Sequence, residues 1–373
     1  MNNKLILTAG PSITEKEISY VTDAVTNGWN ENWNGYITRF EDEFSKYIGV
    51  DNAITTSSCT GALHLGLLAL GIGPGDEVIV PEITWVATAS AVAYVGATPV
   101  FCDIEEGSWC MSVKSAESLI TSKTKAIFPV HLYGHPANMP EVMGLANKYN
   151  LKVIEDAAPS IGAEVGGQKT GSFGDVAGFS FQGAKIMVTG EGGMLVTNNQ
   201  SIFDRVKSLG DHGRNPKYPL AAVEVGYKYK MSNLQAALGL AQLEQLDNFI
   251  IRKRKMGHLY DNYFNSINCI QIPKTKTKYA NNIYWVYGIV LKNECSMNAK
   301  EVMQQLSQYG IGTRPFFYPM HLQPVLNKLG LLKKESYPVS ENLYLNGFYL
   351  PSGLSLTENK INFISETLYK ILS

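Results

Sequence analysis

The feature that most constrains the fold of this chain is a regular alternation of β-rich and helical segments. Between Asn52 and Asp156, five apolar runs are typical of strands: AITT, EVIVP, TPVFCDI, KAIFPV and LKVIED. Helical patterns separate them: GALHLGLLALG and the segments near residues 84–95, 112–122 and 138–149. Strands that alternate with helices in this way usually lie parallel in one sheet, with the helices on its faces. The sequence therefore predicts an α/β domain with a mainly parallel sheet.

The segments that flank this alternation predict a leading helix and a second, smaller domain. Thr14 and Glu17 form a capping-box pattern, and the helix that they begin has an apolar face of Ile18, Val21 and Val25. A helical pattern from Ser232 to about Phe264 predicts a long helix that bridges two domains. The last hundred residues, with TKYANNIYWVYGIVL as strand and NAKEVMQQLSQYG as helix, indicate an α+β unit. For 373 residues we expect two domains, 1–250 and 251–373.

Charge and cysteine content exclude several kinds of partner. The chain has 32 basic and 33 acidic residues, so it creates no positive field that would attract nucleic acid. The uncharged stretch 83–102 reaches membrane-spanning length, but it contains Pro99 and hydroxyl side chains and divides around Gly96 into a helix and a strand. We therefore expect no membrane segment, and no signal peptide. Five cysteines without metal-ligand spacing indicate a reducing cytoplasm and no metal site.

Two ionisable residues stand at the ends of predicted strands. Asp156 closes KVIED, and the carboxyl ends of parallel strands are where open α/β sheets bind ligands. An acid in that position can also cap a helix or face solvent. Lys185 follows the strand VAGFSF in a neighbourhood almost free of other charges. Shelter from water lowers the pKa of a lysine amine and makes it a nucleophile for Schiff-base chemistry, although a lysine at a strand end can also extend into solvent.

A third candidate feature is the segment TTSSCTGAL at residues 55–63, where a strand meets small hydroxyl residues and then a helix. The amino end of a helix offers unpaired amides and a positive dipole, so a phosphate fits there, at Cys59, Thr60 and Gly61. Ser180, at the end of the strand that precedes Lys185, offers a further donor. The same pattern also describes an ordinary Ser/Thr helix cap.

Together with the aromatic side chain of Trp85, these features match pyridoxal 5′-phosphate. Its aldehyde condenses with a lysine, its ring nitrogen pairs with a carboxylate, its phosphate needs donors and its ring face accepts stacking. Each feature alone has a structural explanation, and the combination indicates the cofactor.

Over nearly its whole length the chain resembles the DegT/DnrJ/EryC1/StrS aminotransferases, which are sugar aminotransferases of fold type I. The resemblance rests on SSCTGALHLGLLALGIGPGDEVIVPEITWVATASAVAYVGATPVFCDI, PVHLYGHPANM, VIEDAAPSIGAEVGGQKTGSFGDVAGFSFQGAKIMVTGEGGMLVTN and GYKYKMSNLQAALGLAQLEQLD. It implies an aspartate-aminotransferase-like fold with a three-layer αβα large domain and a small C-terminal α+β domain. It also implies that Lys185 binds pyridoxal phosphate covalently, that Asp156 pairs with the pyridine nitrogen, that Trp85 stacks on the ring, and that Thr60 and Gly61 bind the phosphate with Ser180.

The resemblance further implies a homodimer with shared active sites, in which GYKYKM reaches the neighbour's phosphate. Many relatives have Asn and Arg where this chain has Lys228 and Lys230, so Lys228 would contact the phosphate as a point charge. Two departures lie nearer the chemistry. Pro159 stands where relatives often have Gln or another polar residue, and Gln182 stands where His or an aromatic residue is common. Because of these two departures, the sequence does not determine the identity of the amino acceptor.

The activity that the resemblance implies is a ping-pong transfer of an amino group from L-glutamate to a keto substrate. ITWVATASAVAY and GYKYKMSN look most like the perosamine-synthase branch, which favours a nucleotide-linked 4-keto-6-deoxysugar used for surface polysaccharides or glycoconjugates. Residues expected near the acceptor are those of the WNENW segment at 29–33, with Glu155, Gln182, Arg314 and His321. Each of them also has a purely structural interpretation, as a core anchor, loop contact or cap.

Three alternatives remain at this point. The same transamination can act on a smaller acceptor such as a phosphorylated ketone. A pyridoxal-phosphate-dependent sugar dehydratase is disfavoured because such relatives replace the lysine by histidine or add iron–sulfur cysteines. A non-catalytic cofactor-binding regulator is disfavoured because the chain has no basic helix for DNA. His64 is interpreted as a core histidine, and His131 and His135 lack a further ligand that would complete a metal site.

Overall fold

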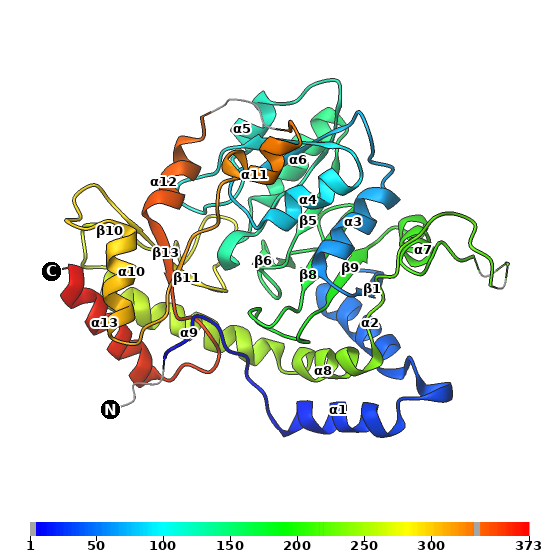
Figure 1. Ribbon diagram of the computed structural model, residues 1–373, viewed down its shortest axis with the longest axis horizontal. Coiled ribbons are helices and arrows are strands. Elements are labelled where there is room, and N and C mark those ends of the chain that lie inside the picture. Colours follow the sequence, from blue (N-terminus) through cyan, green and yellow to red (C-terminus); the bar gives the residue numbers. More distant parts are fainter. Residues whose placement is uncertain (1–4, 216, 219, 332–335, 373) are drawn as a thin grey trace.

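The computed structural model describes residues 5–215, 217–218, 220–331 and 336–372. Within them, a seven-stranded sheet in the order β1-β9-β8-β5-β4-β2-β3 forms the centre of the molecule (Figure 1). Its strands are β1 (Asn52–Thr56), β2 (Glu77–Pro81), β3 (Thr98–Cys102), β4 (Thr124–Ile127), β5 (Lys152–Asp156), β8 (Val176–Ser180) and β9 (Gly193–Thr197). Neighbouring strands are parallel except at β9, which is antiparallel to both β1 and β8. The predicted, mainly parallel sheet is confirmed.

Helices cover both faces of this sheet, since successive side chains of a strand point to opposite sides. In β2, Val78 and Val80 enter one core and Ile79 enters the other. The first core packs against α3 (Cys59–Ala69), α4 (Val86–Tyr94) and α7 (Gln200–Leu209). The second packs against α2 (Gly35–Ile48), α5 (Val113–Ser118), α6 (Met139–Tyr149) and α8 (Asn233–Leu243). The large unit is therefore an αβα sandwich of three layers.

The C-terminal unit is built on a four-stranded antiparallel sheet in the order β10-β11-β13-β12. These strands are β10 (Ile270–Gln271), β11 (Tyr287–Leu291), β12 (Arg314–Pro315) and β13 (Gly347–Leu350). A third core joins the sheet to α9 (Leu246–Phe264), α10 (Ala299–Gln308) and α13 (Glu358–Leu372). Shorter elements are β6 (Glu164–Val165), β7 (Gln168–Lys169), α11 (Pro324–Lys328), α12 (Pro338–Asn346) and three 3₁₀ turns, Asn30–Asn32, Leu132–Gly134 and Met320–Leu322.

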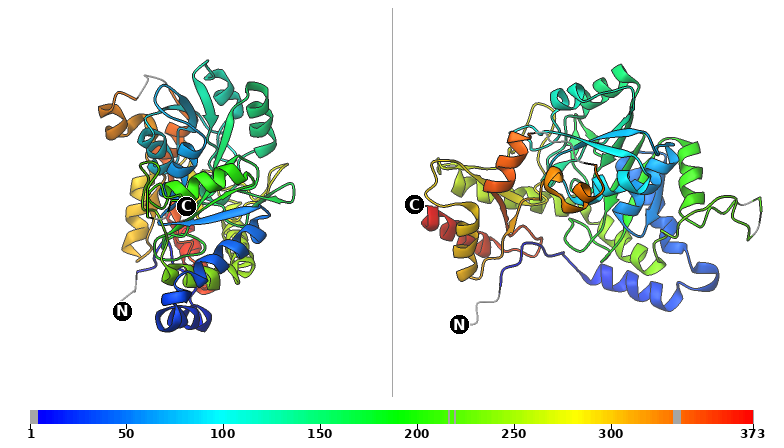
Figure 2. Two further views of the ribbon diagram at one scale, coloured as in Figure 1. Left: turned by 90° about the vertical axis from the view of Figure 1, so that its right-hand side faces the viewer. Right: turned by 45° about the horizontal axis from the view of Figure 1, so that its top comes forward.

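Two connections join the large unit to the C-terminal unit. Helices α8 and α9 run from the large unit into the C-terminal unit (Figure 1). The N-terminal segment returns to the same place, because the amides of Ser352 and Leu354 donate to the carbonyls of Thr8 and Gly10. At the other end of the molecule from the C-terminal unit, the described residues between α7 and α8 project outward (Figure 2).

The predicted bridging helix is wrong in one detail, since it consists of two helices. Helix α8 ends at Leu243 and α9 begins at Leu246. Between them Gln245 adopts φ −114° and ψ 0°, outside the helical region, and its side-chain amide donates to Glu17 on the leading helix α1 (Glu15–Asn27). The predicted domain border at 250 falls inside α9 and remains a prediction.

The capping box of α1 is confirmed, but its buried face is not the apolar one. Thr14 and Glu17 exchange the two capping hydrogen bonds. Glu17 and Ala24 face the protein, whereas Ile18 and Val25 are each 52% exposed. Glu17 is buried because the side-chain amides of Gln242 and Gln245 both donate to its carboxylate. In the uncharged stretch 83–102, the chain forms α4 and β3. Among the described residues, no helix is long and apolar enough to cross a membrane.

Candidate active site

A cavity of about 420 Å³ lies where the carboxyl ends of β5 and β8 face the C-terminal unit. One side of it, here called the strand-end wall, consists of Cys59, Thr60, Trp85, Asp156, Ser180, Gln182 and Lys185. The other side, here called the C-terminal wall, consists of Lys253, Trp285, Arg314, Phe317 and Tyr349. These residues of the strand-end wall were predicted from the sequence, where they span 126 positions from Cys59 to Lys185. The fold brings them together at one site.

The amino end of α3 is shaped as an anion cradle on the strand-end wall. Ser58 caps the helix and accepts a hydrogen bond from the amide of Gly61 at 3.1 Å. The first amides of a helix have no intrahelical acceptor, and Cys59 and Thr60 carry them at the cavity. Gly193 on β9 makes this approach possible, since a Cβ there would lie 2.5 Å from the Cys59 nitrogen. Gly61 itself uses its amide within the cap.

Asp156 is buried at the end of β5 and points into the cavity. Its Oδ2 accepts from the Thr88 hydroxyl at 2.7 Å, and its Oδ1 accepts from the Ala158 amide at 3.2 Å. Burial raises the pKa of this carboxyl above its ordinary value, while the Thr88 hydrogen bond and the nearby Lys185 amine oppose the shift. A cationic group placed in the cavity would therefore gain a carboxylate partner that water does not screen.

Lys185 lies after β8, with its amine against the face of Trp285 at 3.7 Å from the ring centroid. Burial lowers the pKa of this amine to about 8, against the opposing effects of Asp156 and Cys59. The Trp285 ring is in turn held by a hydrogen bond from its Nε1 to the Ala184 carbonyl at 2.8 Å. With this pKa, about a tenth of the amine is neutral at pH 7, far more than for an ordinary lysine, and the neutral amine is a nucleophile.

Trp85, which is 62% exposed, offers a free aromatic face to the cavity. Its ring packs at a tilt of 54° against Phe317 of the C-terminal wall, with 5.7 Å between centroids. Ser180 and Gln182 also line the cavity, and the Gln182 side-chain oxygen accepts from the Ala184 amide at 2.9 Å. Pro159 lines it as well, without a donor. Arg314 extends from β12 into the cavity from the other side.

Glu155 was expected near the acceptor, and the structure corrects this. Its side chain points to the opposite face of β5 from Asp156 and is fully buried. There it accepts hydrogen bonds from three backbone amides, those of Gly171, Phe173 and Gly174, and from His131. The carboxylate has no route to the cavity, because adjacent residues of a strand point in opposite directions.

His321 is corrected in the same way. Its backbone amide and its Nδ1 both contact Oε1 of Glu82, at 2.8 and 2.5 Å. Burial raises the pKa of Glu82 to about 8. This pair fastens the Met320–Leu322 turn to the end of β2, and His321 does not line the cavity.

Lys228 and the two tryptophans of the WNENW segment lie outside this chain's own cavity. The Lys228 amine bonds Asp211 at 2.9 Å, and Lys230 bonds the same carboxylate while lying over the Trp33 ring. The expected contact of Lys228 with a neighbouring subunit remains a prediction.

His64, His131 and His135 each contact a polar group of the protein outside the cavity. His64 lies 3.3 Å from the Tyr229 hydroxyl, His131 contacts Glu155, and His135 contacts the Pro136 carbonyl. In the part of the chain that the structure describes, no three His, Cys, Asp or Glu side chains gather to hold a metal ion.

Comparison with known proteins decides the family. The model of the DegT/DnrJ/EryC1/StrS aminotransferase family matches residues 11–369. The chain belongs to the DegT/DnrJ/EryC1/StrS aminotransferase family. A GDP-perosamine synthase of Escherichia coli O157:H7 is 41% identical over 363 residues, 97% of each chain. Another, from Caulobacter vibrioides, is 38% identical over 98% of each chain.

Solved structures agree with this assignment. A putative sugar aminotransferase from Streptococcus pneumoniae, in its PMP form, superimposes with a TM-score of 0.92 at 28% identity and covers 98% of this chain and 97% of its own. The same protein has also been solved in a PLP form. Membership of the DegT/DnrJ/EryC1/StrS family makes this protein a pyridoxal-phosphate-dependent aminotransferase with the predicted fold type I.

The residues of the cavity fit this cofactor of the DegT/DnrJ/EryC1/StrS enzymes. The strand-end wall provides an amine with lowered pKa, a buried carboxylate, unpaired helix amides and an exposed indole, which are the groups that pyridoxal phosphate requires. The inferred holders are Lys185 for the aldehyde, Asp156 for the ring nitrogen, Trp85 for the ring face, and Cys59, Thr60 and Ser180 for the phosphate.

Sequence reasoning missed the C-terminal wall apart from Arg314. Lys253 is buried, and its amine donates to the carbonyls of Trp285, at 2.8 Å, and of Ser352. Burial lowers the pKa of this amine to about 7. Its position in IIRKRKMG resembles that of any basic residue on a long helix. Trp285 lies inside the strand-like run NNIYWVYGIVL, which predicts a buried strand residue and gives no indication of a cavity.

Proposed function

We propose that this aminotransferase transfers an amino group from L-glutamate to the keto carbon of a nucleotide-linked 4-keto-6-deoxysugar, for surface-polysaccharide or glycoconjugate biosynthesis. The observation that carries the chemistry is the placement of Lys185, Asp156 and the α3 amino end around one cavity. The choice of acceptor is supported by relatives described as GDP-perosamine synthases, at 41%, 38% and 38% identity.

The chemistry divides between the cofactor and the protein. Pyridoxal phosphate supplies an aldehyde that captures amines and a ring that withdraws electrons from the carbon being deprotonated. Asp156 remains ionised and holds a proton on the ring nitrogen. The amides of Cys59 and Thr60 bind the phosphate, and Trp85 keeps the ring oriented.

Lys185 acts as the general acid and base. Its neutral Nζ would take the proton from Cα of the amino donor and pass it to the cofactor in the first half-reaction. In the second, it would carry a proton from the cofactor to the former keto carbon of the acceptor. A pKa of about 8 suits both roles, because the amine is present in both forms near neutral pH. One site that serves donor and acceptor in turn gives ping-pong kinetics.

The acceptor enters between the two walls in this proposal. Arg314, the charged end of the C-terminal wall, offers donors to a phosphate or hydroxyl of the sugar nucleotide. Gln182 offers an amide on the strand-end wall. The 420 Å³ cavity has the size of a site for a cofactor and a sugar ring, so the nucleotide would extend beyond it.

A homodimer with shared active sites also belongs to the proposal. The segment between α7 and α8 exposes large apolar side chains, with Leu220 at 92% and Val225 at 91%. Trp29, Trp33 and Tyr94 are also more than half exposed, and exposed apolar side chains in such number are typical of a subunit interface. The same segment carries Lys228. A cytoplasmic location agrees with the five unpaired cysteines.

A smaller acceptor, such as a phosphorylated ketone, is the second candidate, and Pro159 and Gln182 leave it open. Relatives often have a polar residue at the place of Pro159, and the proline leaves the cavity without that hydrogen-bonding group. The experiment presents the pyridoxamine form of the enzyme with a GDP-linked 4-keto-6-deoxysugar, a UDP-linked one and a phosphorylated ketone. Rapid return of the cofactor's visible absorbance with a nucleotide sugar supports the first proposal. Return with the ketone alone would contradict it.

A further inference from the structure

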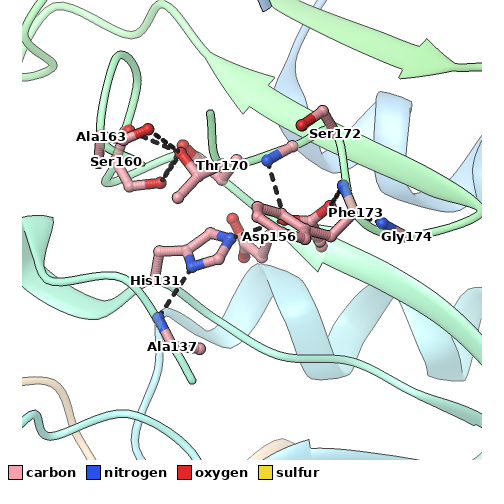
Figure 3. Close-up of polar contacts among 12 residues, drawn as sticks. His131, Ala137, Asp156, Ser160, Ala163, Thr170, Ser172, Phe173 and Gly174 are labelled. Carbon is pink, nitrogen blue, oxygen red and sulfur yellow. Dashed lines mark hydrogen bonds and ion pairs between the residues drawn. The ribbon is translucent and has the colours of Figure 1, made fainter. Parts of the chain in front are cut away.

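The carboxylate of Glu155 is the most highly coordinated buried acid beside the cofactor cavity. Its Oε1 accepts from the amides of Phe173 and Gly174, each at 2.8 Å. Its Oε2 accepts from the Gly171 amide at 2.8 Å and from His131 Nε2 at 3.0 Å. Four donors satisfy a fully buried carboxylate without any cation of Lys or Arg. Figure 3 shows three of the donor residues, His131, Phe173 and Gly174, near the end of β5.

The donors come from segments that each deliver part of the cavity. The amide of His131 donates to the Asp156 carbonyl, and the Asp156 amide donates to the Pro129 carbonyl, so the His131 segment also places Val130 of the cavity lining. The segment 171–174 leads directly into β8, which ends at Ser180 and is followed by Lys185. In β5 itself, Glu155 is the immediate neighbour of Asp156.

His131 has a defined proton position in this arrangement. Its Nδ1 accepts a hydrogen bond from the Ala137 amide at 3.0 Å, so the ring proton is on Nε2, which donates to Glu155. The imidazole therefore links two segments, 131 and 137, to the carboxylate. Its ring is buried.

We propose that Glu155, acting with His131, is a positioning residue of the cofactor site: it holds β5, the His131 segment and the entry to β8 in register, and so sets where Asp156 stands relative to Lys185. The proposal rests on the inferred pairing of Asp156 with the cofactor ring nitrogen. A displacement of about 1 Å at such a site is enough to slow a reaction about 100-fold.

The first test compares Glu155→Gln with Thr170→Val. In the glutamine variant the amide group replaces one carboxylate oxygen, so two of the four donors lose their acceptor. Thr170 immediately precedes the segment 171–174, is buried, and exchanges hydrogen bonds with Ser160 (Figure 3). Thr170→Val therefore loses buried hydrogen bonds, as Glu155→Gln does, and serves as its control. For each variant we would measure thermal unfolding, the dissociation constant for pyridoxal phosphate by tryptophan quenching, the visible absorbance of the bound cofactor against pH, and the rate of the first half-reaction.

We expect Glu155→Gln to weaken cofactor binding and slow the first half-reaction by about 10-fold to 100-fold, and to shift the pH dependence of the cofactor absorbance. Thr170→Val is expected to lower the unfolding temperature comparably while these three readouts stay at wild-type values. Equal effects of the two variants on all readouts would mean that Glu155 is merely structural and would overturn the proposal.

A second pair of variants tests the link through His131. This test can be carried out even if the Glu155→Gln variant does not fold. In His131→Gln the side-chain amide can donate where Nε2 now donates, whereas in His131→Asn the shorter side chain keeps an acceptor for Ala137 and loses Glu155. We expect the glutamine variant to retain cofactor affinity and absorbance and the asparagine variant to lose both. The reverse order, or equal behaviour, contradicts the proposal.

Asp156→Asn separates a failure of this inference from a failure of the proposed function. A severe loss in Asp156→Asn together with a Glu155→Gln variant that behaves like Thr170→Val removes the Glu155 inference alone. A silent Asp156→Asn variant would remove the assigned role of Asp156 and this inference with it.

Discussion

The two walls of the cavity each carry one lysine with a lowered pKa, and the two lysines differ in what surrounds the amine. Burial lowers the pKa of Lys253 to about 7 and that of Lys185 to about 8. The Lys253 amine donates to two backbone carbonyls of the C-terminal unit, whereas Lys185 faces an indole ring and shares the cavity with Asp156. A lowered pKa therefore does not identify the reactive lysine. The groups that surround the amine, an indole ring and Asp156 for Lys185, identify it.

The largest expected effect separates the two lysines. Replacing Lys185 with Ala removes the residue that moves the proton, and we expect kcat to fall by at least about 10⁴-fold. The measurement is single-turnover absorbance with the amino donor. Retention of wild-type turnover in this variant would end the assignment of the strand-end wall as the reactive one.

Asp156→Asn should produce the second largest effect. The amide cannot hold a proton on the ring nitrogen through charge, and loss of one electrostatic group of this kind costs about 10²–10³-fold in rate. Comparison with Thr88→Val, which removes only the hydroxyl that donates to Asp156, provides the control. We expect the Thr88 variant to lie between wild type and Asp156→Asn in steady-state kcat.

Arg314→Gln tests the C-terminal wall as the acceptor side. Loss of a charged donor should raise the acceptor KM by about 10-fold and leave the half-reaction with the amino donor unchanged. The control is Arg314→Lys, which keeps the charge. Slower reaction with the donor in Arg314→Gln, seen in stopped-flow traces, would show that the walls do not divide the substrates in this way.

The pH dependence of cofactor incorporation should follow Lys185. Its neutral amine attacks the aldehyde, and for a pKa of about 8 the neutral fraction rises about five-fold from pH 7 to pH 8 and levels off above pH 9. Because Asp156 raises this pKa, Asp156→Asn should move the profile to lower pH. The rate of absorbance change in apoenzyme mixed with the cofactor measures both. A profile that still rises steeply at pH 10 contradicts the lowered pKa.

The smallest kinetic effect is expected for Lys253→Met. The two carbonyls that it leaves unpaired should lower stability by about 1–3 kcal/mol each, seen in urea unfolding. Turnover at a temperature well below the transition should nevertheless stay near that of wild type. A loss of rate as large as that of Lys185→Ala would erase the distinction between the walls.

The strand-end wall was largely predictable and the C-terminal wall largely was not, for physical reasons. Asp156 and Lys185 follow strands whose apolar runs are clear in the sequence, and strand ends of a parallel sheet meet at one edge. The side on which Glu155 points depends on the sheet's register, which the pair Glu155-Asp156 does not reveal by itself. His321 was misassigned because its partner, Glu82, is 239 positions away. Lys253 and Trp285 enter the site only through the packing of α9 against the C-terminal sheet.

Chemical mapping of the attached cofactor identifies the reactive lysine. The reconstituted enzyme would be reduced with borohydride, digested and analysed by mass spectrometry, with Lys253 as the competing lysine inside the same cavity. We expect the added mass of the reduced cofactor on Lys185 and none on Lys253. A modified Lys253, or unmodified peptides at both positions, would contradict the assignment of Lys185.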